Sequence, residues 1–177
     1  MGNHMVLTHT EKNLLNSALP NPCQICLRFV ICICFCAMMI SCGAGVRARS
    51  LLGGKLNVTV NVSEKVNLNA PIAMDLLLVY NDQLRDTLLK MSAKDWFRQK
   101  DQIKRDYIEG EGLDCWSWEW VPGQKIPVQK LPLKSNAKAG IVFADYLSPG
   151  AHRIRFSPFD DIVIRLLEKD FFVDVQE

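Results

Sequence analysis

Two apolar stretches in the middle of the chain have the patterns of β-strands. In KLNVTVNV, which begins at Lys55, apolar and polar residues alternate. This period of two predicts a strand with one buried and one solvated face. IAMDLLLVY, which begins at Ile72, is almost continuously apolar, as is typical of a strand covered on both faces. The predicted buried face of the first strand comprises Leu56, Val58, Val60 and Val62.

A helical pattern follows the second strand, in NDQLRDTLLKMSAKDWFRQKDQIKRDY. Ser92 followed by Asp95 resembles a capping box, with Asp in place of the usual Glu. Beyond it, Trp96 and Ile103 fall on one helical face, while charged residues fill the other positions. The sequence predicts a short helix around 84–90 and then a longer helix on the surface of the domain.

The last third of the chain predicts further short strands separated by turns. CWSWEW alternates, and KIPVQKLPL carries two prolines that confine it to a sheet edge. The turn LSPG joins AKAGIVFADY to AHRIRF, and DIVIRLLEKDFFVDV predicts two short strands or a strand and a turn. About seven or eight strands with one helical insertion after the second predict a mainly β fold, a two-sheet sandwich of antiparallel strands.

Three tryptophans share one face of the CWSWEW strand: Trp116, Trp118 and Trp120, with Cys115 on the other face. A row of indoles could form a platform for a ligand or a partner. We expect instead that the preceding helix covers this face of the sheet. The platform stays open as the alternative.

Charge and cysteine content narrow the function classes. The chain has 21 Lys and Arg against 19 Asp and Glu, so there is no electrostatic reason to expect nucleic acid as a partner. Six of the seven cysteines precede residue 43, and Cys115 alone cannot form a disulfide framework in the later part. Cys23 and Cys26 have CxxC spacing, but no second ligand pair follows to complete a zinc site. The sequence therefore predicts no metal site.

A short apolar run, Phe29–Ile40, contains Cys32, Cys34 and Cys36 and follows Arg28. A transmembrane helix needs about 20 apolar residues, and this run is shorter. Its length and the preceding positive charge are those of a signal-peptide hydrophobic region. An uncleaved, buried hydrophobic segment is the alternative interpretation.

The sequence Met39-Ile40-Ser41-Cys42, at the end of this run, resembles the lipobox of bacterial lipoproteins. The resemblance implies a diacylglycerol on the Cys42 thiol, cleavage after Ser41 and acylation of the new amino terminus. Gly rather than Asp at residue 43 favours the outer membrane. We expect three parts: a leader and lipoprotein signal peptide at 1–41, a lipidated tether at 42–54 and a β-sandwich domain at 55–177. The covalent lipid is the only cofactor expected.

The order of motifs along 56–156 resembles the TssJ/SciN family of outer-membrane lipoproteins in the type VI secretion system. The motifs are VNVSEKVNLNAP, DLLLVYN, DTLLKMSAKDWF, VPGQKIPVQKLPL and AKAGIVFADYLSPGAHRIRF. The resemblance implies a transthyretin-like two-sheet sandwich with an added helical piece and no catalytic chemistry. It also implies a place on the periplasmic face of the outer membrane, where the protein would hold the periplasmic end of TssM, a partner anchored in the inner membrane.

The resemblance also implies a site, because in this family the loop between the first two strands contacts the partner. Carried over to this chain, the partner-binding residues are Val66, Asn67, Leu68, Asn69, Ala70 and Pro71.

Two other function classes stay open. An enzyme would have to use His152, because His4 and His9 precede the predicted cleavage site, and no G-x-S-x-G or HExxH motif is present. We expect His152 to lie on the surface of a strand. The other class is a different envelope lipoprotein, such as a secretion pilotin or a ligand- or peptidoglycan-binding module, with the tryptophan face as its site.

Overall fold

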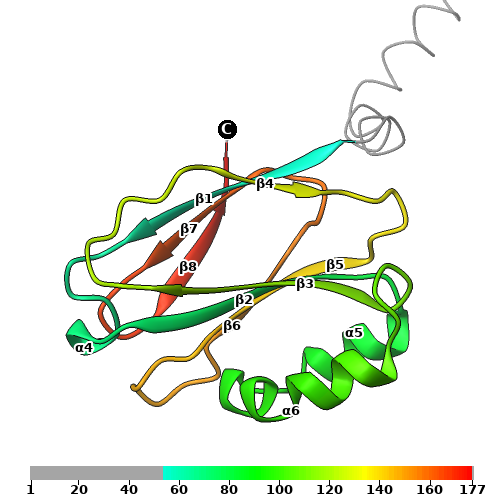
Figure 1. Ribbon diagram of the computed structural model, residues 1–177, viewed down its shortest axis with the longest axis horizontal. Helices are drawn as coiled ribbons and strands as arrows, with labels where there is room; N and C mark the ends of the chain where they lie inside the picture. The colour runs from blue at the N-terminus through cyan, green and yellow to red at the C-terminus, as the bar shows by residue number, and fades with distance from the viewer. Residues whose placement is uncertain (1–53, 177) are drawn as a thin grey trace, which may run out of the picture. The chain divides into compact units, whose positions relative to one another are not determined.

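The computed structural model describes residues 54–176 (Figure 1). The predicted signal peptide, the predicted lipidation site at Cys42 and the predicted tether up to residue 53 lie outside the described residues. Within the described part, no helix is long and apolar enough to span a bilayer.

Eight strands form two four-stranded sheets, which confirms the mainly β, two-sheet sandwich predicted from the sequence. In sheet A the order is β4 (Gln129–Pro132), β1 (Lys55–Val62), β7 (Ile162–Leu166) and β8 (Phe171–Val175). In sheet B the order is β3 (Leu113–Trp120), β2 (Ile72–Val79), β5 (Ala139–Ala144) and β6 (Arg153–Phe156).

One strand pair departs from the predicted antiparallel arrangement. β1 runs parallel to β7, with Val58 opposite Ile162, whereas the other pairs in both sheets are antiparallel. The alternation of apolar residues reports which face of a strand is buried, but it carries no information on the direction of the neighbouring strand. The parallel pair could therefore not be predicted from the sequence pattern.

The main hydrophobic core lies between the two sheets. Leu56, Val58 and Val60 of β1 are buried in it, which confirms the inward face predicted for this strand. From sheet B the alternate residues of β2 point into the same core. These residues are Ile72, Met74, Leu76 and Leu78.

The predicted helical insertion follows β2 and consists of α5 (Asp82–Leu88) and α6 (Ala93–Asp106). Both helices lie on the side of sheet B that faces away from sheet A (Figure 1). The capping box is present, because Ser92 Oγ accepts from the Asp95 amide while the Asp95 carboxylate accepts from the Ser92 amide. Since helices cover one face of β2 and sheet A covers the other, its continuous apolar run is explained.

Trp96 attaches α6 to sheet B. Its side chain is fully buried and stacks on Phe143 of β5, with ring centroids 5.3 Å apart. Its indole Nε1 donates a 2.8 Å hydrogen bond to the buried carboxylate of Asp75 on β2, and Lys100 Nζ lies 3.0 Å from the same carboxylate. These contacts join two turns of the helix to the middle of the sheet.

The prediction that this helix covers the tryptophan face is wrong. The helix packs on the side of sheet B that carries Cys115 and Leu77, whereas Trp116, Trp118 and Trp120 face sheet A. Trp120 is buried, and Trp116 and Trp118 are half-buried at the edge of the core. Alternation separates the two faces of a strand, but it does not say which layer each face meets.

Candidate functional site

Three loops meet at one end of the sandwich: 63–71 between β1 and β2, 145–152 between β5 and β6, and 167–170 between β7 and β8. We call this the loop end. Gly54, where the described chain begins, lies at the opposite end of β1 (Figure 1). Eight residues at about 3.3 Å each separate the two ends by about 26 Å.

The first of these loops contains a left-handed turn. Element α4 (Val66–Asn69) has positive φ at three consecutive residues, with 47° at Asn67, 58° at Leu68 and 65° at Asn69. Asn tolerates this conformation, but for Leu it costs about 1–2 kcal/mol. Contacts elsewhere in the loop end must therefore hold the turn in place.

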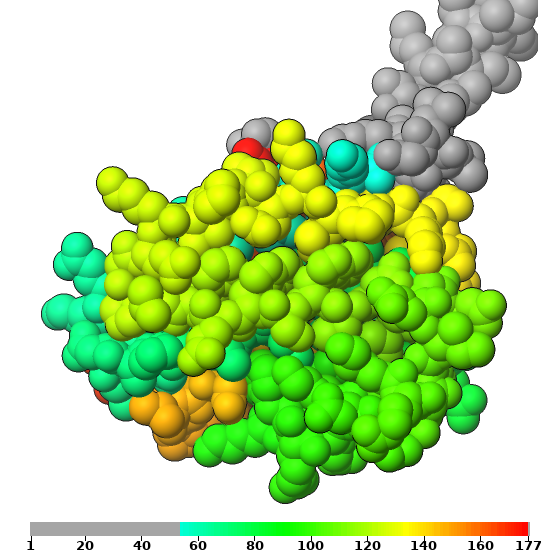
Figure 2. Space-filling model, viewed as in Figure 1, coloured from blue at the N-terminus to red at the C-terminus, as the bar shows by residue number. Residues whose placement is uncertain are grey.

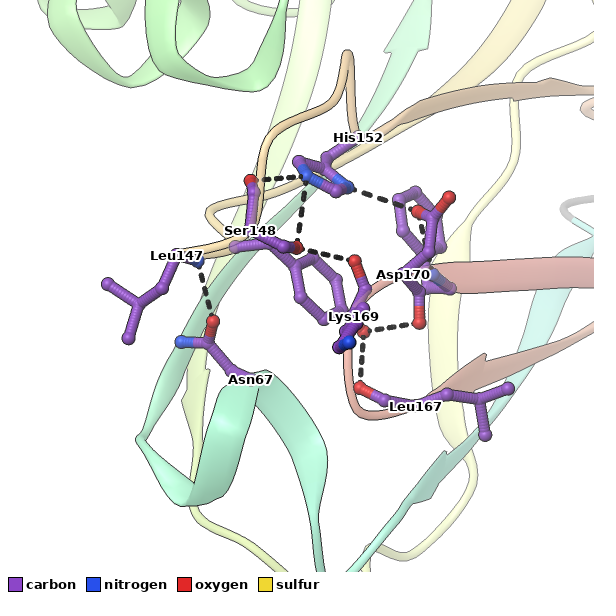
Figure 3. A network of polar contacts seen from close by, with 9 residues as sticks. Asn67, Leu147, Ser148, His152, Leu167, Lys169 and Asp170 are labelled. Carbon is purple, nitrogen blue, oxygen red and sulfur yellow. Dashed lines mark hydrogen bonds and ion pairs between the residues drawn. The ribbon is translucent and has the colours of Figure 1, made fainter.

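Asn67 provides several of these contacts. Its backbone amide donates to the Leu167 carbonyl at 3.3 Å, and the next amide, of Leu68, donates to the Glu168 carbonyl at 3.1 Å. Its buried side chain donates from Nδ2 to the Pro71 carbonyl at 2.8 Å and accepts from the Leu147 amide at 2.7 Å (Figure 3). One asparagine thus fastens its own loop to both of the other loops.

His152 lies at the centre of a second set of contacts, next to the first (Figure 3). Its ring is buried, with Nδ1 3.1 Å from the Asp170 carboxylate and Nε2 2.9 Å from the Ser148 carbonyl. The prediction that His152 lies on a strand surface is therefore wrong: it precedes β6, with φ of 42°, and its ring turns inward. Gly150 makes room, because a Cβ there would lie 2.7 Å from the imidazole.

Ser148, His152 and Asp170 have the residue types of a hydrolase triad, but their hydrogen bonds are not those of a triad. The Ser148 hydroxyl donates to the Lys169 carbonyl at 2.5 Å and lies 3.5 Å from His152 Nε2. A general base needs a nitrogen free to accept the hydroxyl proton, and here Nε2 contacts a backbone carbonyl. This arrangement fastens loops and does not activate a nucleophile.

Tyr146 completes the attachment of 167–170. Its hydroxyl donates to the Asp170 carbonyl at 2.8 Å and contacts the Leu167 carbonyl at 3.1 Å. Burial of the ring raises the pKa of Tyr146 well above its ordinary value, so the hydroxyl stays a donor throughout the physiological range. The ring packs between His152 and Phe171, which places it at the centre of the loop end.

Three leucines on the three loops expose large apolar side chains: Leu68 is 45% exposed, Leu147 63% and Leu167 42%. The side chains of Leu147 and Leu167 point away from the polar network on opposite sides of it (Figure 3). Exposed aliphatic side chains held on a fixed backbone are suited to contact with another protein.

The structure divides the six residues predicted to bind the partner into two groups. Leu68, Asn69 and Pro71 are exposed and Ala70 is half-buried. Val66 and Asn67 are buried: Val66 belongs to the core, and the Asn67 side chain is hydrogen-bonded to the loops. The sequence did not indicate Leu147 and Leu167; the one signal for Leu147 was its place at the start of the LSPG turn.

The other candidate sites are a metal site, a small hollow beside α6 and the tryptophan face, and each gives weaker evidence of a function than the loop end does. Within residues 54–176 there is no group of three His, Cys, Asp or Glu side chains that could hold a metal ion. A small hollow of about 100 Å³ lies between α6 and β3, which is room for a few water molecules. The tryptophan face is directed into the sandwich and is not an open platform.

No protein-family model and no curated protein matches the chain, but solved structures do. The lipoprotein TssJ1 of the type VI secretion system from Pseudomonas aeruginosa matches with a TM-score of 0.55 and 12% identity over 71% of this chain and 98% of that chain. Lip from Serratia marcescens, a membrane-bound component of the same type of system, matches with a TM-score of 0.51 and 19% identity, over 68% and 96% of the two chains.

A third match is the C-terminal domain of the type VI secretion protein TssM from EAEC, with a TM-score of 0.50 and 15% identity over 67% of this chain and 96% of that chain. At these identities the likeness establishes the fold. The resemblance read from the sequence is thus confirmed as a fold: this chain has the sandwich of the TssJ lipoproteins.

Proposed function

We propose that this chain is a lipid-anchored structural component of a type VI secretion membrane complex, of the TssJ type, and that its loop end docks the periplasmic part of a TssM-type partner. The fold likeness to TssJ1 and Lip supports the class of protein. The observation that carries the docking site is the loop end itself, where a buried polar network fixes three loops and leaves one leucine exposed on each.

The placement of the loop end suits such a connector. With Cys42 in the inner leaflet of the outer membrane, the chain would enter the sandwich at Gly54 after eleven intervening residues. The loop end lies at the far end of β1, about 26 Å away. It would therefore face the periplasm, from which a partner anchored in the inner membrane arrives.

The fixed loops also suit tight binding. Loops that order only on binding lose conformational entropy at that moment, whereas pre-formed loops do not. Burying a leucine side chain contributes about 1.5–3 kcal/mol. A few such contacts on a rigid base are enough for a specific interface, and the proposal needs no catalytic step.

The docking site is tested by measuring binding of the full chain to the periplasmic region of a TssM-type protein from the same organism. We expect Leu68→Asp and Leu147→Asp each to weaken binding about tenfold or more, because each places a charge in an apolar contact. Ile108→Asp is the matched control, since Ile108 is 70% exposed but precedes β3 at the opposite end of the strands. Equal loss of binding in all three variants would place the interface elsewhere.

The anchor is tested separately by labelling cells with radioactive palmitate. The full chain is expected to incorporate label, and Cys42→Ser is expected to abolish incorporation. If the chain binds the partner but incorporates no lipid, the result would support the docking site and contradict the lipid anchor.

A further inference from the structure

Strand β3 forms one edge of sheet B, and most of that edge is open. Its first residue, Leu113, is bridged by Glu109. The remaining seven, Asp114–Trp120, pair with β2 on one side and with no strand of residues 54–176 on the other. In Figure 2 the yellow-green atoms of this part of the chain form the middle of the surface turned to the viewer.

Of the other three edges of the sandwich, two carry residues that disfavour pairing and the third is shorter than β3. β4 has four residues that include Lys130 and Pro132, and β6 has four residues that include Arg153 and Arg155. β8 has five residues. β3 is the longest edge, with eight residues and no proline, lysine or arginine. A long edge without such residues is a template for another strand.

The side chains along this edge also leave apolar surface uncovered. Trp116 and Trp118 are half-buried, and Trp118 stacks on the buried Trp120 with ring centroids 5.9 Å apart. A strand added beside β3 would place its alternate side chains against the exposed edges of these indoles.

We propose that β3 pairs with β3 of a second copy of this chain, antiparallel and related by a two-fold axis at Ser117. Ser117 is the midpoint of Asp114–Trp120, so this register uses the whole open edge. It sets Trp116 of each copy opposite Trp118 of the other, and cross-strand aromatic pairs are among the favourable ones. The contact is the same on both copies, so it closes at the dimer.

Charge complementarity supports a second copy as the occupant. The same register sets Glu119 of one copy opposite Cys115 of the other. Cys115 lines the small hollow beside α6 together with Lys104, which is exposed. Within its own copy, Glu119 is exposed and lies opposite the uncharged Ala73. In the dimer, each Glu119 therefore approaches Lys104 of the other copy. Glu109, which lies on the rim of the same hollow, has the same charge as Glu119 and opposes this approach.

Site-specific photo-crosslinking in the full chain tests the pairing. A photoreactive residue in place of Ser117 is expected to give a product of twice the chain mass. The same residue in place of Arg155, on the protected β6 edge, is the control and is expected to give none. Absence of the double-mass product at Ser117, or a crosslink there to a different protein, would overturn the proposal.

Charge reversal tests the register by sedimentation equilibrium. Glu119→Lys and Lys104→Glu are each expected to raise the dimer dissociation constant about fivefold, because two symmetry-related ion pairs are lost. The double variant is expected to restore the dimer. Glu64→Lys, an exposed change on the loop end, should leave it unchanged. A double variant no better than the singles would overturn this register.

The proposed dimer does not depend on the proposed docking of a TssM-type partner. An experiment can therefore contradict either proposal and leave the other in place. Loss of the crosslink at Ser117 would leave binding at the loop end untouched. Loss of partner binding in Leu68→Asp would leave the dimer intact.

Discussion

Asp75 has a carboxylate that is buried under α6. Its hydrogen-bond and ion-pair partners determine how much free energy the burial of this charge costs. It is 1% exposed and receives a hydrogen bond from Trp96 Nε1 and an ion pair from Lys100. A buried charge with one partner removed is strongly destabilising. Trp120 is the opposite case, since its buried indole N–H has no acceptor among the described residues.

These two tryptophans give a matched pair of variants. Trp96→Phe and Trp120→Phe remove the same atoms from buried positions, but only the first breaks a hydrogen bond to a charged group. We expect Trp96→Phe to lower the free energy of unfolding by about 1.5–3 kcal/mol more than Trp120→Phe. Urea denaturation of both variants measures the difference, and equal losses would contradict the importance of the Asp75 contact.

Because of Cys115, the free energy of unfolding is expected to depend on pH in the alkaline range. Burial, with the nearby negative charge of Asp75, raises the pKa of its thiol from 9.0 to about 11. Between these values the unfolded thiol is ionised and the folded one is not. The folded state then binds more protons, so its stability falls as pH rises through the window.

The expected loss between pH 8 and pH 10.5 is about 2 kcal/mol for this group. Cys115→Ala should remove that part of the decline, while the contributions of Tyr80 and Tyr146, whose pKa values are also raised, remain. Denaturation curves of the two proteins at both pH values measure it. Identical declines would show that the thiol titrates normally in the folded state.

At the scale of elements, substitutions in the left-handed turn α4 distinguish an effect on stability from an effect on partner binding. Leu68, with φ of 58°, opposes the backbone preference of its residue type, but it exposes the side chain proposed to meet the partner. Glycine adopts this conformation without strain.

Leu68→Gly is therefore expected to keep or raise the melting temperature while weakening partner binding about tenfold or more. Asn69→Gly, at φ of 65°, is the control for the backbone effect and should leave the melting temperature nearly unchanged. Calorimetric melting and a binding titration on each variant measure the two effects. A fall in melting temperature in Leu68→Gly would mean that the leucine side chain itself holds the turn.

A feature could be predicted from the sequence where the residues that determine it lie close together in the chain. The inward face of β1 and the Ser92 cap follow from spacing within one element, and both were predicted correctly. The inward turn of His152 and the burial of Asn67 depend on partners 18 and 80 residues away. Such contacts leave no pattern in the local sequence, so the loop was predicted but its fixed arrangement was not.

At the scale of the whole molecule, two hydrophobic clusters share one sheet. β2 and β5 direct alternate residues into the core between the sheets and into the layer under the helices. The helical layer cannot detach without exposing the outer face of β2, so both clusters are expected to unfold together.

Leu88→Ala tests this cooperativity, because Leu88 of α5 is fully buried in the cluster between the helices and sheet B. We expect it to lower the stability of the whole domain by about 2–5 kcal/mol. Tryptophan fluorescence and far-UV circular dichroism should still give one coincident transition in urea. A separate early transition would show that α5 and α6 form an independent unit.

The position of β1 also has a mechanical consequence. It is the one segment between Gly54 and the loop 63–71 in the chain. In the proposed connector, a pull between the membrane and the partner would therefore run lengthwise along this strand. β7 and β4 hold it from both sides through hydrogen bonds that lie across the direction of the pull. The bonds would share the force in shear instead of breaking one after another, so the sandwich resists extension along the axis on which it would be loaded.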